Sequence, residues 1–113
     1  MIKTISVYSL PKGTDPDEFW KYHTEVHGAD VRKAAGPGLK KFVINRVTQV
    51  LRGEPKFFGV IEMWWESREA MDGYPARAAA FKTATGKSPL EDFRPRVTES
   101  FGAIVEEKEI PFK

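Results

Sequence analysis

The two histidines of this chain are the residues best suited to proton-transfer chemistry. His23 and His27 lie four positions apart in one segment, and the chain contains no cysteine. Imidazole is the one side chain whose unperturbed pKa, about 6.5, lets it gain or lose a proton near neutral pH. A histidine at the edge of a cleft is therefore suited to general acid–base catalysis. We expect His27, which lies shortly before a Gly-Pro-Gly break, to be the catalytic residue and His23 to be the second candidate.

The same pair has two other interpretations. Histidines at positions i and i+4 hold a metal in a longer motif, but that motif has a Glu directly after the first His. Here Thr24 follows His23, and no third ligand stands out, although Asp30 lies one turn beyond His27. We therefore expect no metal, no flavin and no other cofactor. The remaining alternative is that one or both rings simply border the core, with a ring nitrogen bonded to the backbone.

Aromatic side chains and one carboxylate are the candidates for contacting a substrate. Trp20 and Tyr22 accompany the histidines, and Trp64 lies in the most apolar segment of the chain. We predict that these three side chains shape an apolar cleft between the first helix and a sheet. Glu62 alternates with Trp64, and a carboxylate buried there would have a perturbed pKa. The alternative for Glu62 is an exposed or interfacial position.

Composition restricts the class of protein. A chain of 113 residues corresponds to one domain, residues 1–113, and 41% hydrophobic residues are enough to build a core. The net charge is only +2, and both signs are intermixed, which argues against nucleic-acid binding. No segment approaches the roughly 20 apolar residues of a membrane span, and the amino terminus lacks the features of a signal peptide. We expect a cytoplasmic protein without membrane contact.

Alternation of apolar residues predicts the strands. They are expected at 2–10, 39–51, 56–66 and 97–109. Pro11-Lys12-Gly13 ends the first strand, and a turn is expected at 52–55. The strand at 56–66 is apolar on both faces, so we place it in the centre of the sheet.

Two helical regions separate these strands. The first has a cap at Thr14 or Asp15 followed by Pro16, runs to about residues 33–35, and ends at Gly36. An α-helical period places four residues on its apolar stripe, with the histidines on one flank: Phe19, Tyr22, Val26 and Ala29. The second region begins with a cap at Ser67, continues as a helix over 76–85, and is followed by a loop or short helix over 86–96.

The order of these elements predicts a ferredoxin-like α+β fold. The βαββαβ order is that of a split βαβ arrangement, a four-stranded antiparallel sheet with both helices on one face. The second face of such a sheet would leave apolar side chains in water. A second copy of the chain is the simplest cover, so we expect a homodimer.

The sequence resembles the EthD family, named from ethyl tert-butyl ether degradation, of the dimeric α+β barrel superfamily. The resemblance covers essentially the whole chain and rests on these residues: Phe19, His27, Pro37-Gly38-Leu39-Lys40-Lys41-Phe42 and Trp64-Trp65-Glu66-Ser67. It implies a protomer whose sheet packs face to face on that of a twin, and chemistry without metal or organic cofactor in which the family's histidine corresponds to His27. Related enzymes often have a Tyr after Pro-Gly-Leu where this chain has Phe42, a further substrate-binding candidate.

Two functions follow as hypotheses. The first is a cofactor-independent acid–base enzyme, of isomerase, cyclase or decarboxylase type, acting on a small hydrophobic, aromatic or lactone-like metabolite with His27 as general acid or base. The second is a non-catalytic accessory or metabolite-binding module of an oxidative degradation pathway. Haem degradation on the same superfamily fold is a weaker third reading, because that group's Asn, Trp and His residues are not found in matching order.

Overall fold

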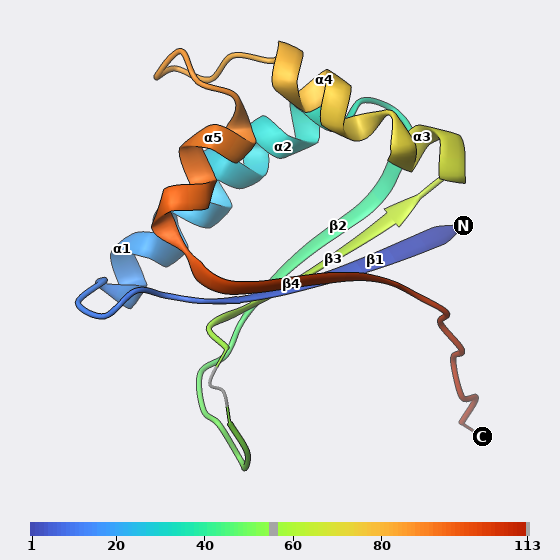
Figure 1. Cartoon of the computed structure of the whole chain (residues 1–113). Helices are drawn as coiled ribbons and strands as arrows, with labels where there is room; N and C mark the ends of the chain where they lie inside the picture. The colour runs from blue at the N-terminus through green and yellow to red at the C-terminus, as the bar shows by residue number, and fades with distance from the viewer. Residues whose placement is uncertain (55–56, 113) are drawn as a thin grey trace.

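A single antiparallel sheet and one layer of helices make up the fold (Figure 1). A computed structural model of the chain describes residues 1–54 and 57–112. Its elements, in chain order, are β1 (Ile2–Ser9), α1 (Pro16–Lys21), the π-helical segment η1 (Tyr22–His27), α2 (Gly28–Ala35), β2 (Leu39–Arg46), β3 (Gly59–Trp65), α3 (Arg68–Asp72), α4 (Tyr74–Ala80), α5 (Pro89–Phe93), the 3-10 turn η2 (Arg94–Arg96) and β4 (Thr98–Val105).

The four strands follow the order β2-β3-β1-β4, and every neighbouring pair is antiparallel. This confirms the predicted ferredoxin-like α+β fold and the central position of the apolar strand. The strands are shorter than predicted: β2 ends at Arg46, and β4 ends at Val105. The predicted start of the third strand, residue 56, and residue 55 of the predicted turn lie outside the described residues.

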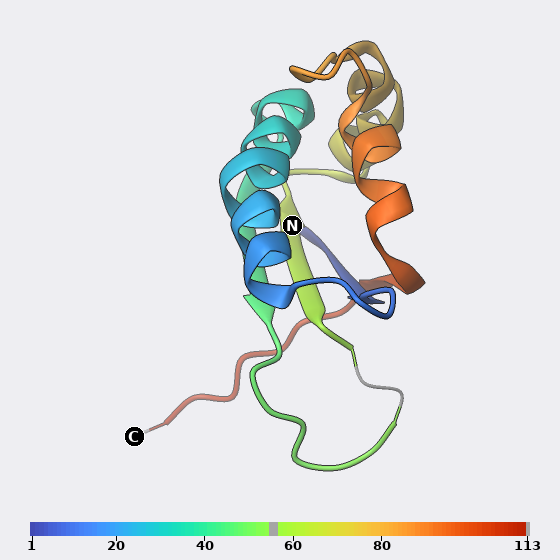
Figure 2. The same cartoon turned by 90° about the vertical axis from the view of Figure 1, so that its left-hand side faces the viewer.

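The sheet has one face toward the helices and one open face. Tyr8 packs on Phe19 of α1 and on Phe93 of α5, so its side chain points to the helical layer. Val7 must point the other way, because successive residues of a strand alternate between faces. Its cross-strand partners Val60 and Phe101 share that open face. In Figures 1 and 2 the helices are gathered on one side of the sheet.

The first helical region is longer than any other and is started by a side-chain cap. Asp15 accepts hydrogen bonds from the backbone N–H groups of Asp17 and Glu18, as the sequence predicted for one of its two cap candidates. The helix continues through η1 into α2 and stops at Gly36, whose φ of 76° is left-handed and favours glycine.

The predicted apolar stripe of this helix is confirmed at Phe19 and Tyr22, which pack in the core, and is wrong at Val26 and Ala29. Val26 and Ala29 are exposed, whereas His23, His27 and Val31 are buried. The reason is the π-helical turn η1, in which the Gly28 N–H bonds to the carbonyl of His23, five residues earlier. A π-turn holds one residue more than an α-turn, so it moves the inward face of the helix from Val26 to His27.

The second helical region differs from the predicted helix over 76–85. It consists of the short helices α3, α4 and α5. α4 ends at Ala80 because Phe81 is extended, and the chain then forms a turn in which the Thr83 N–H bonds to the Lys87 carbonyl at 2.9 Å. α5 starts anew at Ser88, which forms a capping box with Glu91.

The core consists of two clusters between sheet and helices. The first is built on Tyr8, Phe19 and Phe93, and the second on Ala35, Leu39 and Trp65. Tyr8 lies across the backbone of Gly59 on the neighbouring strand, where an added Cβ would collide with the tyrosine ring. Gly59 therefore provides the space that Tyr8 needs beneath the histidine-bearing helix.

Candidate functional site

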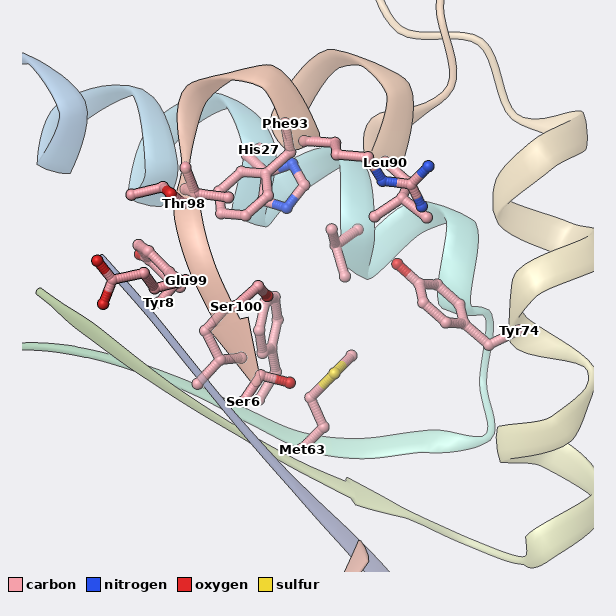
Figure 3. Close-up of a pocket in the computed structure, with 15 residues that line it drawn as sticks. Ser6, Tyr8, His27, Met63, Tyr74, Leu90, Phe93, Thr98, Glu99 and Ser100 are labelled. Carbon is pink, nitrogen blue, oxygen red and sulfur yellow. The ribbon is translucent and has the colours of Figure 1, made fainter. Parts of the chain in front are cut away.

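A cleft of about 450 Å³ lies between the sheet and the helices (Figure 3). It touches both core clusters, and its lining comes from all four strands and from the helical layer: Ser6, Tyr8, His27, Val31, Phe42, Ile61, Met63, Tyr74, Leu90, Phe93, Arg94, Val97, Thr98, Glu99 and Ser100. The lining is mostly apolar, with a few polar groups. Both the size and this composition are typical of pockets for small molecules, which measure about 300–1,000 Å³.

An irregularity at the start of β4 shapes the mouth of the cleft. Thr98, Glu99 and Ser100 are consecutive and all line it, which a regular strand with alternating side chains does not allow. The register between β1 and β4 shifts between Val7 and Ser9, and Glu99 has a positive φ of 50°, which is uncommon for a residue other than glycine. This distorted backbone lets neighbouring residues border the same cavity.

His27 forms part of the cleft wall. Its imidazole stacks on the ring of Phe93, with centroids 4.1 Å apart and planes inclined by 17°. Only 7% of the residue is exposed, and its Nδ1 atom is buried without a hydrogen-bond partner. The cleft-facing side of this ring is therefore its one route to a bound molecule.

His23 lies behind His27 and does not line the cleft. It is fully buried, at 0% exposure, and its Nδ1 atom is hydrogen-bonded to the hydroxyl of Tyr8. Its Nε2 atom has no hydrogen-bond partner. The centroids of the two imidazole rings are 5.4 Å apart. The π-turn places both rings inward together, so that His23 connects the cleft-lining histidine to the buried tyrosine.

Tyr22 attaches this part of the helix to α5 and η2. Its hydroxyl donates to a carboxylate oxygen of Asp92 at 3.0 Å, and the guanidinium of Arg96 lies 4.0 Å from the centre of its ring. Arg96 also donates through Nε to the Asp92 carbonyl at 3.0 Å. The Tyr22 ring also stacks against His27, with centroids 6.1 Å apart. These contacts fix the position of His27 without lining the cleft themselves.

Burial keeps both imidazoles uncharged at neutral pH. Loss of hydration lowers the pKa of His23 from 6.5 to about 4. It is also the main cause that lowers the pKa of His27 to about 3, to which the neighbouring His23 and Arg96 add, while Asp92 acts in the opposite direction. The hydroxyl of Tyr8 stays protonated as well, because burial raises its pKa. The resting site therefore contains neutral hydrogen-bonding groups.

The structure brings together only part of the predicted site. His27 and Phe42 line the cleft, and His23 lies directly behind it. Tyr22 supports His27 from outside the cleft, which corrects the expectation that it shapes the pocket. Trp20 is also absent from the lining; its ring is covered by the guanidinium of Arg46, 5.2 Å from the ring centre.

Glu62 and Trp64 lie on the open face of the sheet, opposite the cleft. Glu62 forms an ion pair with Lys3 at 2.8 Å, and hydrogen bonds from Lys3 and then Asn45 lower the pKa of its carboxyl group. The Trp64 ring is contacted by the ammonium groups of Lys3 and Lys41. The prediction that Glu62 and Trp64 contact a substrate beside His27 is corrected, because strand alternation turns both away from the helices.

Sequence reasoning missed the residues that complete the site. Tyr8 lies in the predicted first strand and Phe93 in the predicted loop or short helix over 86–96, and neither is among the predicted site residues. The alternation of β1 puts Tyr8 on the helix-facing side, and a buried tyrosine hydroxyl needs a hydrogen-bond partner, so Tyr8 carried a usable signal. The contact of Phe93 with His27 joins segments far apart in the sequence, and local patterns contain no signal for it.

The described residues offer no group of three or more His, Cys, Asp or Glu side chains arranged to hold a metal ion. The absence of a cofactor remains a prediction from the sequence. Within residues 1–54 and 57–112, no helix has the length and apolar character needed to cross a membrane.

Solved structures share this architecture over nearly the whole chain. An EthD-family protein from Bacillus halodurans has a TM-score of 0.67 and 27% sequence identity, over 96% of this chain and 99% of that one. The structure therefore confirms the resemblance to the EthD family. No protein-family model matches the chain, and no curated protein matches it.

Two structures of lower sequence identity have the same fold. A dimeric ferredoxin-like protein of unknown function from Thermobifida fusca has a TM-score of 0.63 and 17% identity, over 92% of this chain and 88% of that one. A cofactor-independent oxygenase from Streptomyces nogalater has a TM-score of 0.62 and 14% identity, over 96% of this chain and 94% of that one. At these identities the likeness concerns the fold alone.

Proposed function

We propose that the chain is a cofactor-independent acid–base enzyme of isomerase, cyclase or decarboxylase type, acting on a small hydrophobic, aromatic or lactone-like metabolite. The observation that supports this most is that His27 borders an apolar cleft of about 450 Å³. The cleft has room for such a metabolite, and His27 is the histidine that reaches it. In this proposal His27 is the general acid or base, and Phe42, Phe93 and Met63 contact the apolar part of the substrate.

The test begins with a substrate screen of lactones and aromatic polyketide-like acids. With a substrate in hand, His27→Gln is expected to lower the rate by roughly two to four orders of magnitude, the usual contribution of a general acid or base. His23→Gln, which changes the buried histidine behind the cleft wall, is the comparison variant and is expected to have a smaller effect, because His23 does not line the cleft. Circular dichroism and light scattering must show an unchanged fold and assembly. Unchanged turnover in His27→Gln would refute the catalytic assignment.

The second candidate function is binding without turnover, as an accessory or metabolite-binding module of an oxidative degradation pathway. It is supported by the pKa of His27, lowered to about 3, because a histidine with so low a pKa is a weak base at neutral pH. The same compounds would then bind, as measured by calorimetry, while none is converted. Conversion of any of them that depends on His27 would exclude this alternative.

We further propose that the protein acts as a cytoplasmic homodimer, with the open faces of two sheets packed together. The support is the apolar character of that face, where Val7, Val60 and Phe101 form cross-strand neighbours and Phe101 is 59% exposed. The Thermobifida fusca protein of the same fold is described as dimeric. Burying this face between two copies would remove its apolar area from water.

A further inference from the structure

Two sealed ring nitrogens in the helical layer have no hydrogen-bond partner. They are Nε2 of His23 and Nδ1 of His27, and they belong to rings whose centroids are 5.4 Å apart. Buried polar atoms are nearly always hydrogen-bonded, so an unpaired one calls for an explanation. Here two unpaired atoms occur on neighbouring rings. An imidazole nitrogen can donate or accept, so each of these atoms can serve as the partner of the other.

The bond to Tyr8 decides which nitrogen of His23 carries the proton. Burial keeps the Tyr8 hydroxyl protonated and the His23 ring neutral. The hydroxyl is hydrogen-bonded to Nδ1 of His23, and a neutral imidazole has one donor nitrogen and one acceptor nitrogen. Among the described residues the Tyr8 hydroxyl has no other hydrogen-bond partner, so its proton is satisfied by donation to Nδ1 of His23, which leaves the N–H group of that ring on Nε2. The unpaired atom of His23 is thus a donor.

A proton on Nε2 of His23 favours the tautomer of His27 in which the unpaired Nδ1 atom is an acceptor. If Nδ1 of His27 accepts from His23, the proton of the neutral His27 ring must be on Nε2. Because the His27 ring lines the cleft while Nδ1 is sealed, Nε2 is the nitrogen available to a bound molecule. The contact requires a small rotation of one ring, or one buried water between the two nitrogens.

We propose that Tyr8 and His23 are positioning residues that lock His27 in the tautomer with its N–H group directed to the cleft. The chain of donors runs from the Tyr8 hydroxyl to Nδ1 of His23, from Nε2–H of His23 to Nδ1 of His27, and from Nε2–H of His27 to the ligand. This inference builds on the proposed function and narrows it: His27 acts as a hydrogen-bond donor, on the acid side of acid–base catalysis. A neutral histidine in such a role polarises a carbonyl or stabilises a developing oxyanion.

The surroundings of the two rings favour a series of hydrogen bonds that orients His27 and moves no net charge along it. Moving a proton along the whole chain would leave a tyrosinate at Tyr8, which burial disfavours. Asp92 and Arg96, the two charged groups that shift the pKa of His27, act in opposite directions. Aromatic rings, chiefly those of Phe93 and Phe19, pack against the two imidazoles. Both rings therefore stay neutral, and Tyr8 and His23 determine only which ring nitrogen of His27 carries the proton.

The ligand class that fits this site is a neutral carbonyl compound or lactone with an apolar body. Its oxygen would accept from Nε2–H of His27, and the apolar part would lie on Phe42, Ile61 and Met63. The buried donor has no charge to pair with a carboxylate, so recognition of an acid would depend on Arg94 in the same lining.

The lock is tested by NMR on the full chain labelled with 15N-histidine at pH 7. Because the chain contains only two histidines, His23→Gln assigns the two ring patterns. The expected result is two neutral rings, each with a protonated Nε2 and an unprotonated Nδ1. A proton on Nδ1 of His27 in the unmodified protein would overturn the proposal without any variant.

Tyr8→Phe tests whether the hydroxyl sets the tautomers. The variant keeps the ring and removes the donor, so His23 is expected to populate both tautomers and His27 to lose its single form. Tyr74→Phe, which removes a different hydroxyl from the cleft lining, is the matched control and is expected to change neither ring. Unchanged tautomers in Tyr8→Phe would refute the lock.

His23→Phe provides the same test if Tyr8→Phe does not fold. It removes the donor facing Nδ1 of His27 and should release the His27 tautomer, whereas a His27 ring unchanged in this variant would also refute the lock. These spectra require no substrate. A failure of the proposed enzymatic function, with no turnover found, is thus distinguishable from a failure of the tautomer lock.

Discussion

The two histidines share one helix but differ in what their ring atoms meet. His27 lines the cleft and stacks against Phe93, whereas His23 is enclosed between Tyr8 and the aromatic cluster. Both are placed where a charged imidazole would lose its hydration. Such sites give each ring a defined hydrogen-bonding state at neutral pH, and they make the folded protein sensitive to acid.

We predict that stability falls as the pH is lowered from 7 to 5. The folded-state pKa values of about 4 for His23 and about 3 for His27 lie below the value of 6.5 for an unperturbed histidine. The unfolded chain therefore takes up protons in this window while the folded chain does not, so stability is full above about pH 6.5 and is lost as the pH falls. The loss should be about 2 kcal/mol per histidine by pH 5, measured by urea unfolding.

The histidine variants separate this contribution from that of other groups. His27→Gln and His23→Gln should each reduce the difference in unfolding free energy between pH 7 and pH 5 by about 2 kcal/mol. The same carboxyl groups are present in all three proteins, so their contribution cancels in the comparison. A variant whose pH dependence equals that of the unmodified chain would show that the replaced histidine is not kept neutral by burial.

At the scale of elements, the site depends on how two short pieces of helix meet. The π-turn η1 rotates His23 and His27 inward, and α5 brings Phe93 onto the face of His27. α5 spans only Pro89–Phe93, and a helix this short has little stability of its own. Its position must depend on its cap and on its packing.

We predict that the cap of α5 controls the environment of His27. Ser88 is buried and accepts from the Glu91 N–H, while the Glu91 carboxylate accepts from the Ser88 N–H. Ser88→Ala should lower the unfolding free energy by about 1 kcal/mol. It should also shift the His27 ring signals in NMR spectra, because Phe93 is held less firmly.

The matched control is the cap of α3. Ser67 accepts from the Ala70 N–H at 3.1 Å, and neither residue lines the cleft. Ser67→Ala should also be destabilising, through the same loss of a cap, while the His27 signals remain in place. Equal shifts in both variants would mean that α5 does not transmit the effect to His27.

At the scale of the whole molecule, the sheet has one covered and one open face. The open face carries the apolar neighbours Val7, Val60 and Phe101 next to the ionic group of Lys3, Glu62 and Glu107. Lys3 bonds to both carboxylates at 2.8 and 2.7 Å. A mixed apolar and polar surface of this kind is typical of the interface between two protein chains.

We predict a twofold dimer held by this open face. Light scattering should give twice the mass of the 113-residue chain at micromolar concentration, and Phe101→Glu should yield a monomer, because it places a charge in the apolar centre of the interface. Leu51→Glu is the matched control: Leu51 is 85% exposed and lies in the loop after β2, so its variant should remain dimeric. A stable monomer of the unmodified chain would refute the prediction.

The sequence by itself determined the order of the elements and which side chains of a strand share a face. Caps and breakers such as Asp15, Ser67 and Gly36 lie where they were predicted. The alternation of β1 and the apolar character of β3 fixed the antiparallel sheet. These features are local, because a cap, a left-handed glycine or a two-residue period acts within a few positions of the chain. His27, which was predicted as a site residue from its imidazole and the Gly-Pro-Gly break that follows it, lines the cleft.

Only the tertiary structure decided which side chains meet in the site. A π-turn arises from the balance of packing on both sides of a helix, so an α-helical period placed Val26 inward where His27 is found. Trp64 and Glu62 looked like partners of the histidines, yet the direction of β3 relative to the helices turned them to the open face. The contacts of Tyr8 with His23 and of Phe93 with His27 join distant parts of the chain. No local pattern specifies them, because they depend on how the elements pack.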